Sequence, residues 1–140
     1  MRYHCHLMKQ ERLKRTRVLV ADDHELVLRR VRTLLQSDFE VVGDARNGRE
    51  MVAEAIRLKP DVIVADIAMP ELSGIDAARE LRKEGFVAKL VFLTVYSEDE
   101  FISACMEEGA LGYVMKVHMK TDLIPAIKAA LSGQLFISAL

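Results

Sequence analysis

The chain has 140 residues, of which 51% are hydrophobic and 29% are charged, and its formal net charge is −1. This length suits one domain with a core of its own, and a nearly neutral charge gives no sign of nucleic-acid binding by the whole chain. No apolar run approaches the roughly 20 residues of a membrane-spanning helix, so we expect a cytoplasmic protein that makes no contact with a membrane.

The chain begins with a basic segment. Six lysine and arginine residues and a single acidic residue, Glu11, lie within residues 1–17. We interpret residues 1–16 as a flexible extension, which this composition favours over a nucleic-acid-binding arm. His4, Cys5 and His6 are possible zinc ligands, but adjacent residues do not easily close a tetrahedral site and no fourth ligand is spaced to complete it.

Five short apolar runs alternate with five segments of helical periodicity along the rest of the chain. The runs predict strands at residues 17–21, 39–45, 62–65, 90–94 and 112–115. In the last helix, Thr121 and Asp122 are expected at the start, Pro125 in the first turn and Gly133 at the end.

Strands and helices that alternate with short connections predict an α/β fold. Right-handed crossovers place helices on both faces of a parallel sheet. We therefore expect a doubly wound, flavodoxin-like domain with a five-stranded parallel sheet in the order 2-1-3-4-5. In this order strands one and three are neighbours, and ligands bind at their carboxyl ends.

Acidic residues follow two of these strands. Asp22 and Asp23 end the first strand, and Asp66 ends the third. A lone aspartate after a strand often only caps the next helix. Three carboxylates that converge on one crevice, however, repel one another, and a hard divalent cation such as Mg²⁺ removes that conflict.

A hydroxyl and an ammonium end the fourth and fifth strands, at Thr94 and Lys116. Each has an ordinary explanation, as a β-branched strand residue and as a surface charge. Together with the carboxylates they fit phosphoryl transfer, in which an aspartate is the nucleophile while a metal ion and a lysine neutralise the phosphoryl oxygens.

With this set of residues the chain resembles a known family, the receiver domain of two-component response regulators. The matching residues are Asp22-Asp23, Asp66 with Met69-Pro70 and Gly74 behind it, Thr94, and Tyr113-Val114-Met115-Lys116. The motif ADDH after the first strand and the closing segment AIKAALSGQLFIS are most similar to the NarL/FixJ (LuxR-type) subfamily.

The resemblance implies that Asp66 is the phosphoacceptor and that Mg²⁺ binds Asp22, Asp23, Asp66 and the main-chain carbonyl of Ala68. A sensor histidine kinase is the implied phosphoryl donor.

The resemblance also implies how phosphorylation changes the conformation of the domain. Thr94 would bond a phosphoryl oxygen, Lys116 would form a salt bridge to it, and Tyr113 would be the switch aromatic that turns inward when Thr94 moves. The surface of the fourth helix, fifth strand and fifth helix would then change, as a population shift driven by added charge.

Some positions depart from the family pattern. Val117 follows Lys116 where many receivers have proline, which leaves the geometry of that peptide bond open. Ala68 and Tyr96, each two residues after a site residue, leave the lifetime of a phosphoryl group open.

The same residues bear on other functions. A haloacid-dehalogenase-type phosphohydrolase requires a second aspartate two residues after the nucleophile, where this chain has Ala68. A flavin or nucleotide module would have glycines or hydroxyls after the first strand, where Asp22 and Asp23 stand. A receiver that binds partners without being phosphorylated stays open.

For domain organisation we expect the receiver domain over residues 17–134 and the start of a linker or tail over 135–140. Regulators of this subfamily usually continue into a helix-turn-helix domain, so we expect transcription regulation, with DNA contacted only through a further domain that this chain does not contain. A homodimer, through the first and last helices or through the fourth-helix face, is a family-level expectation.

Overall fold

The computed structural model describes residues 15–138. The flexible extension predicted over residues 1–16 therefore lies outside the described residues except at its end. There, Arg15 Nη2 donates to the carbonyl of Gln36 at 2.9 Å, and the carbonyl of Thr16 accepts from the N–H of Glu40 at 2.9 Å. These last two residues of the extension are thus bonded to the domain.

The centre of the domain is a parallel sheet with the strand order β2-β1-β3-β4-β5-β6. The predicted α/β fold and the predicted order 2-1-3-4-5 are confirmed for the first five strands. The strands are β1 (Arg17–Ala21), β2 (Glu40–Ala45), β3 (Val62–Ala65), β4 (Lys89–Thr94), β5 (Gly112–Met115) and β6 (Phe136–Ile137).

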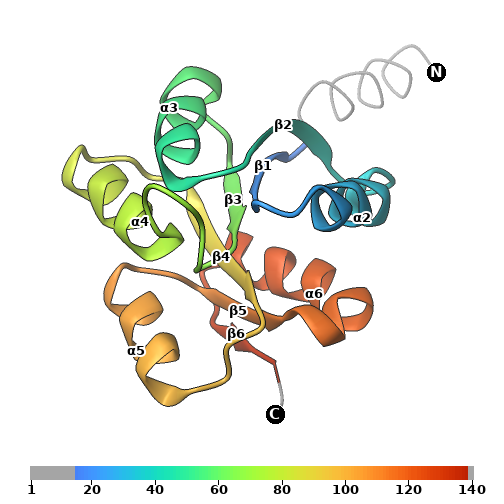
Figure 1. Ribbon diagram of the computed structural model, residues 1–140. Helices are drawn as coiled ribbons and strands as arrows, with labels where there is room; N and C mark the ends of the chain where they lie inside the picture. The colour runs from blue at the N-terminus through green and yellow to red at the C-terminus, as the bar shows by residue number, and fades with distance from the viewer. Residues whose placement is uncertain (1–14, 139–140) are drawn as a thin grey trace.

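Helices cover both faces of this sheet (Figure 1). One face is covered by α2 and α6 and the other by α3, α4 and α5. The central strand β3 is consequently buried along its whole length, as a continuous apolar run predicts for a strand covered on both faces. The helices are α2 (Glu25–Leu35), α3 (Gly48–Leu58), α4 (Gly74–Lys83), α5 (Asp99–Glu107) and α6 (Met119–Leu131), with a 3₁₀ turn, η1 (Lys116–His118), before α6.

The helices owe their positions to apolar stripes at helical spacing. In α2, Leu28, Val31 and Leu35 are buried and the arginines between them are exposed. None of the helices between residues 15 and 138 combines the length and the hydropathy of a membrane span.

The start of the last helix was predicted wrongly. The 3₁₀ turn η1 continues into α6 at Met119, which already has helical dihedral angles, so the helix begins two residues before Thr121. Pro125 is consequently the seventh of the 13 helical residues rather than part of the first turn. Thr121 does not cap the helix; its hydroxyl donates to the carbonyl of His118 at 3.2 Å.

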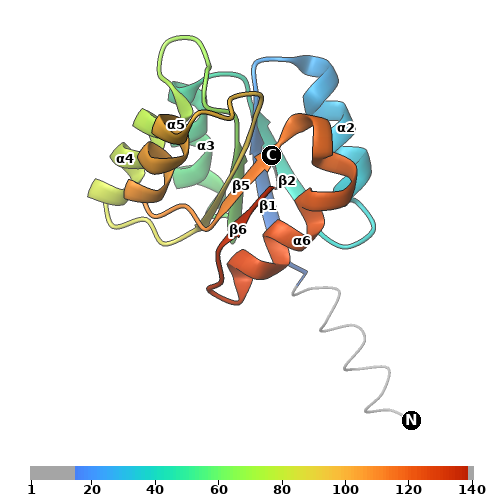
Figure 2. The ribbon, with the colours of Figure 1, turned by 90° about the horizontal axis from the view of Figure 1, so that it is seen from below.

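A sixth strand extends the sheet within the segment where a linker was expected to begin. In β6, Phe136 pairs with Gly112 and Ile137 pairs with Tyr113 at the edge of the sheet (Figure 2). Next in the chain, Ser138 Oγ accepts from the N–H of Met115 at 3.1 Å and donates to Asp122 Oδ2 at 2.8 Å. Two paired residues are too few to produce a periodic signal in the sequence.

Replacing Ser138 with alanine is expected to destabilise the domain by about 1–3 kcal/mol, because a buried N–H and a carboxylate oxygen each lose a partner. Ser138 is 3% exposed, so water does not readily take its place. Equilibrium denaturation in urea measures the change. Ser132→Ala, at an exposed position, is the control and should change stability by less than about 0.5 kcal/mol. Equal stabilities of the two variants would contradict this role of Ser138.

Candidate functional site

Two buried carboxylates lie side by side at the carboxyl end of the sheet. Ala21 and Ala65 are paired in the parallel register of β1 and β3, so the residues that follow them, Asp22 and Asp66, emerge at the same edge. Asp22 is 1% exposed and Asp66 is 4% exposed. The N–H of Asp66 donates to the carbonyl of Ala21 at 2.9 Å, which fixes the ends of the two strands to each other.

Lys116 connects these two carboxylates. Its ammonium lies 2.7 Å from Asp22 Oδ2 and 3.1 Å from Asp66 Oδ2. The contact with Asp66 is a hydrogen bond, whereas the contact with Asp22 is an ion pair outside hydrogen-bond geometry. The other oxygen of Asp66, Oδ1, accepts from the N–H of Ile67 at 2.8 Å. The ammonium therefore offsets part of the charge that two buried carboxylates bring together.

Burial and charge shift the protonation equilibria of the site. Burial, followed by the negative charge of Asp22, raises the pKa of Asp66, and Lys116 only partly opposes this shift. Burial by itself would lower the pKa of Lys116, but the contacts with Asp22 and the charge of Asp66 raise it. Lys116 therefore remains an ammonium at neutral pH.

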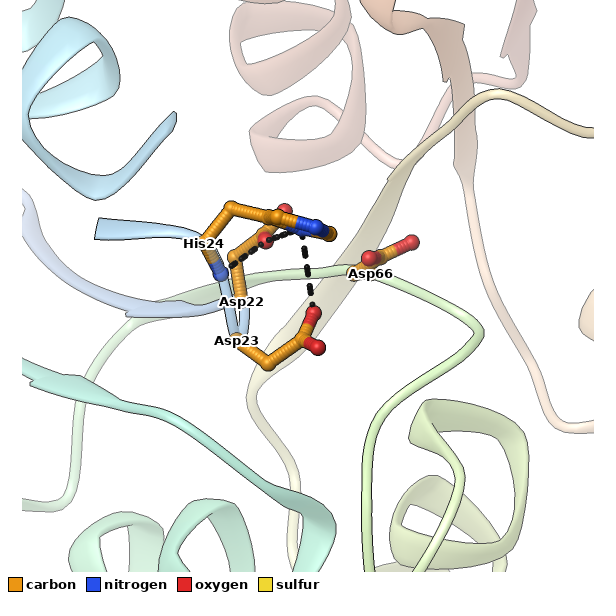
Figure 3. Close-up of side chains that lie close together, drawn as sticks. All are labelled: Asp22, Asp23, His24 and Asp66. Atoms are coloured by element: carbon orange, nitrogen blue, oxygen red, sulfur yellow. Dashed lines mark hydrogen bonds and ion pairs between the residues drawn. The ribbon is translucent and has the colours of Figure 1, made fainter. Parts of the chain in front are cut away.

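Asp23 and His24 complete an acidic cluster in front of the two buried carboxylates (Figure 3). His24 Nδ1 lies 3.2 Å from Asp22 Oδ1 and 3.2 Å from Asp23 Oδ1. One ligand atom of each of Asp22, Asp23, His24 and Asp66 lies within 4.8 Å of those of the other three.

These residues fit a divalent cation. Oxygen ligands of this kind suit a hard cation, and the buried oxygen Asp22 Oδ2 accepts no hydrogen bond from any residue of the described range 15–138. Sequence reasoning did not include His24 in the site, although its place directly after two aspartates was a signal for it.

Thr94 and Tyr113 lie on the neighbouring strands, and Tyr96 connects them. Both side chains are fully buried. Thr94 Oγ1 accepts from the N–H of Tyr96 at 3.2 Å, and the hydroxyl of Tyr113 donates to the carbonyl of Tyr96 at 2.5 Å. The ring of Tyr96 stacks on that of Phe101 in α5, with centroids 4.6 Å apart. A continuous chain of contacts therefore runs from Thr94 at the sheet edge to the helix α5.

The remaining predicted ligand, Ala68, lies in the exposed part of the loop between β3 and α4. At the other side of the site, no peptide bond between residues 15 and 138 is cis, so the Lys116–Val117 bond is trans. The structure thus brings Asp22, Asp23, Asp66 and Lys116 together, and places Thr94 and Tyr113 in one contact chain beside them.

The sheet order and the acidic edge define the class of protein as a flavodoxin-like receiver fold. A family model described as response regulator receiver domain matches residues 18–128. The chain belongs to this family, whose domains are phosphoacceptor signalling modules.

Curated relatives agree with this assignment. The chain is 38% identical over 120 residues to the transcriptional regulatory protein LiaR of Bacillus subtilis, an alignment that covers 84% of this chain and 57% of that protein. It is 37% identical over 131 residues to a nitrate/nitrite response regulator protein homolog of Haemophilus influenzae, covering 92% and 62%. The chain thus spans less than two thirds of the length of these relatives.

Solved structures show the same fold. A two-component response regulator of the LuxR family from Aurantimonas has a TM-score of 0.84 at 30% identity, covering 89% of this chain and 91% of that chain. The isolated receiver domain of RcsB from Salmonella enterica, studied in the presence of the phosphomimetic BeF₃⁻, has a TM-score of 0.81 at 25% identity, covering 89% and 94%.

Proposed function

We propose that the chain is a phosphorylation-controlled switch in which Asp66 accepts the phosphoryl group. The observation that carries the proposal is the environment of this carboxylate. It is buried at the carboxyl edge of the sheet, bonded to one lysine, and grouped with Asp22 and Asp23 in a cluster able to hold a cation. A carboxylate of this kind is suited to act as a nucleophile toward phosphorus.

In the reaction, a carboxylate oxygen of Asp66 forms a bond to the phosphorus of the donor, and the bond from phosphorus to the donor's leaving atom breaks. The leaving atom keeps that electron pair. The product is an acyl phosphate, which places more negative charge at the position of one carboxylate. Lys116, which lies 3.1 Å from Asp66 Oδ2, would pair with the added charge.

The cation of this site is proposed to be Mg²⁺. Asp22, Asp23 and Asp66 would hold it, together with the main-chain carbonyl of Ala68. When bound, the ion neutralises charge on the phosphoryl oxygens. An oxygen-rich ligand set is the kind that Mg²⁺ uses.

The switch is proposed to run through Thr94 and Tyr113. A phosphoryl oxygen would accept a hydrogen bond from the hydroxyl of Thr94, which would draw this side chain toward the phosphoryl group and away from the N–H of Tyr96. The carbonyl of Tyr96 accepts the hydrogen bond from Tyr113, and the ring of Tyr96 stacks on that of Phe101. The outer surface of α5, β5 and α6 is the proposed output surface.

The wider role is proposed by analogy with the relatives. A sensor histidine kinase would supply the phosphoryl group, and the switch would control transcription through a DNA-binding domain outside residues 1–140, with a homodimer as a further possible assembly. The basis for this is that curated relatives such as LiaR and PdtaR are transcriptional regulatory proteins and are longer than this chain.

Intact mass spectrometry after incubation with acetyl phosphate tests the proposal. We expect a gain of one phosphoryl group that requires Mg²⁺ and is lost in Asp66→Asn. Asp38→Asn, at an exposed position in the turn before β2, is the control and should be modified like the parent chain. A phosphoryl group retained by Asp66→Asn would overturn the assignment. No gain by the parent, with no binding of BeF₃⁻, would favour a receiver that only binds partners.

A further inference from the structure

His24 is directed into the acidic cluster although the helix that it precedes does not need its side chain. It is the N-cap residue of α2, in an extended conformation, and its side chain makes no capping hydrogen bond. Its backbone N–H donates to Asp22 Oδ1 at 2.9 Å instead. This contact holds the residue so that Nδ1 lies 3.2 Å from a carboxylate oxygen of each of Asp22 and Asp23.

A second observation points to a ligand at the same place. Asp22 Oδ2 is buried without a hydrogen bond from any residue of the described range, and only 2% of the Asp22 side chain is exposed. The ammonium of Lys116 lies 2.7 Å from this oxygen as an ion pair, and because a carboxylate oxygen has two lone pairs, one remains available to a cation. The ligand atoms of the cluster, including a nitrogen of His24, already lie within 4.8 Å of one another.

We propose that His24 supplies a nitrogen ligand to this cation site, so that the site binds first-row transition metal ions such as Ni²⁺ through three carboxylates and an imidazole. The proposal rests on the cation site proposed above. An imidazole nitrogen favours Ni²⁺ and Zn²⁺ strongly, whereas Mg²⁺ prefers oxygen ligands and gains little from it. His24 is thus a specificity-determining residue for the cation.

Ligation requires a change of tautomer in the imidazole ring. Without a cation, the proton on Nδ1 is the donor toward Asp22 Oδ1, because carboxylate oxygens only accept. With a cation bound, Nδ1 contributes its lone pair and the ring proton sits on Nε2. The side chain of His24 is 68% exposed, so this proton exchanges with water.

Isothermal titration calorimetry with NiCl₂ and with MgCl₂ tests the proposal. All proteins carry His4→Ala, Cys5→Ser and His6→Ala, so that these other potential ligands contribute nothing. We expect His24→Phe to weaken the Kd for Ni²⁺ by at least about tenfold and to change the Kd for Mg²⁺ by less than about twofold. His118→Phe is the matched control, since His118 is also an exposed N-cap residue without a side-chain cap bond. It should change neither value.

The visible spectrum of the Co²⁺-loaded protein gives a second readout, because losing a nitrogen ligand shifts its absorption bands. The proposal is overturned if Ni²⁺ does not bind, if His24→Phe leaves the Kd for Ni²⁺ unchanged, or if it weakens Ni²⁺ and Mg²⁺ equally. Mg²⁺ binding by the parent, and its loss in Asp23→Asn, tests the carboxylate site separately. If the parent did not bind Mg²⁺, or if Asp23→Asn bound it as tightly as the parent, the cation site itself would be contradicted. If His24→Phe left the ratio of the Ni²⁺ and Mg²⁺ affinities unchanged, only the role of His24 would be contradicted.

Discussion

Lys116→Met is expected to destabilise the metal-free domain at pH 7 by on the order of 2–4 kcal/mol. Methionine has nearly the length of the lysine stem but no ammonium. The substitution therefore leaves Asp22 and Asp66, which are 1% and 4% exposed, as buried carboxylates without a positive charge between them. Removing one member of a buried ion pair is costly because the remaining charges stay desolvated.

The deficit in the free energy of unfolding of Lys116→Met, relative to the parent, should depend on pH. The pKa of Asp66 is already raised by burial and by Asp22, and Lys116 lowers it, so the substitution raises it further. A carboxyl group with a higher pKa in the folded state binds its proton more tightly when folded. Stability is therefore gained as the pH falls through the folded pKa toward the unfolded pKa of about 4. The deficit should be largest at neutral and alkaline pH and should shrink toward about pH 5.

Urea denaturation of the parent and of Lys116→Met between pH 5 and pH 8 measures this difference. Lys120→Met, at an exposed position in the first turn of α6, is the control and should show no pH-dependent deficit. Mg²⁺ should stabilise Lys116→Met more than the parent, since the ion then enters a cluster without a competing ammonium. A deficit that is constant from pH 5 to pH 8 would mean that the ammonium stabilises the domain through packing alone.

Much of this site could be predicted from the sequence, because strand ends have local signals. Asp22, Asp66, Thr94 and Lys116 each directly follow or end an apolar run, and the parallel order of the sheet brings such residues to one edge. The prediction needed only the runs and their order. It did not require knowledge of any individual contact.

The contacts that escaped prediction are those made by backbone groups and by very short elements. The carbonyl of Tyr96, which accepts the bond from Tyr113, is a group that every residue possesses, so no residue type marks it. The strand β6 has two residues, and its register depends on Ser138 bonding to Met115, a contact between positions 23 residues apart. Such contacts are set by the tertiary structure.

Gly74→Ala is expected to destabilise the domain by about 3 kcal/mol or more. A Cβ on Gly74 would lie 1.9 Å from the carbonyl oxygen of Asp66 and 3.3 Å from Cε1 of Phe92. The first of these contacts is with backbone, which no side-chain rotation relieves. The backbone φ of Gly74 is not in the left-handed region, so close approach, rather than conformation, explains the glycine.

The sign of the stability change in Gly74→Ala distinguishes the effect of the close backbone contact from the effect of helix propensity. Gly74 is the first residue of α4, and propensity alone predicts that alanine at a helical position stabilises by roughly 1 kcal/mol. Gly43→Ala is the control, because its Cβ would meet the terminal methyl of Leu58 at 2.7 Å, which can rotate away. Thermal denaturation should therefore rank Gly74→Ala well below Gly43→Ala.

Gly74→Ala should also disturb the cation site. Relief of the clash requires the chain at Asp66 or the start of α4 to move, and Asp66 is the residue that shares Lys116 with Asp22. Mg²⁺ affinity should consequently fall in Gly74→Ala and remain at the parent value in Gly43→Ala. If Gly74→Ala were as stable as the parent, the loop from Asp66 to Gly74 would have to be free to move away from the strand end. It could not then hold Asp66 in the fixed position that a phosphoacceptor requires.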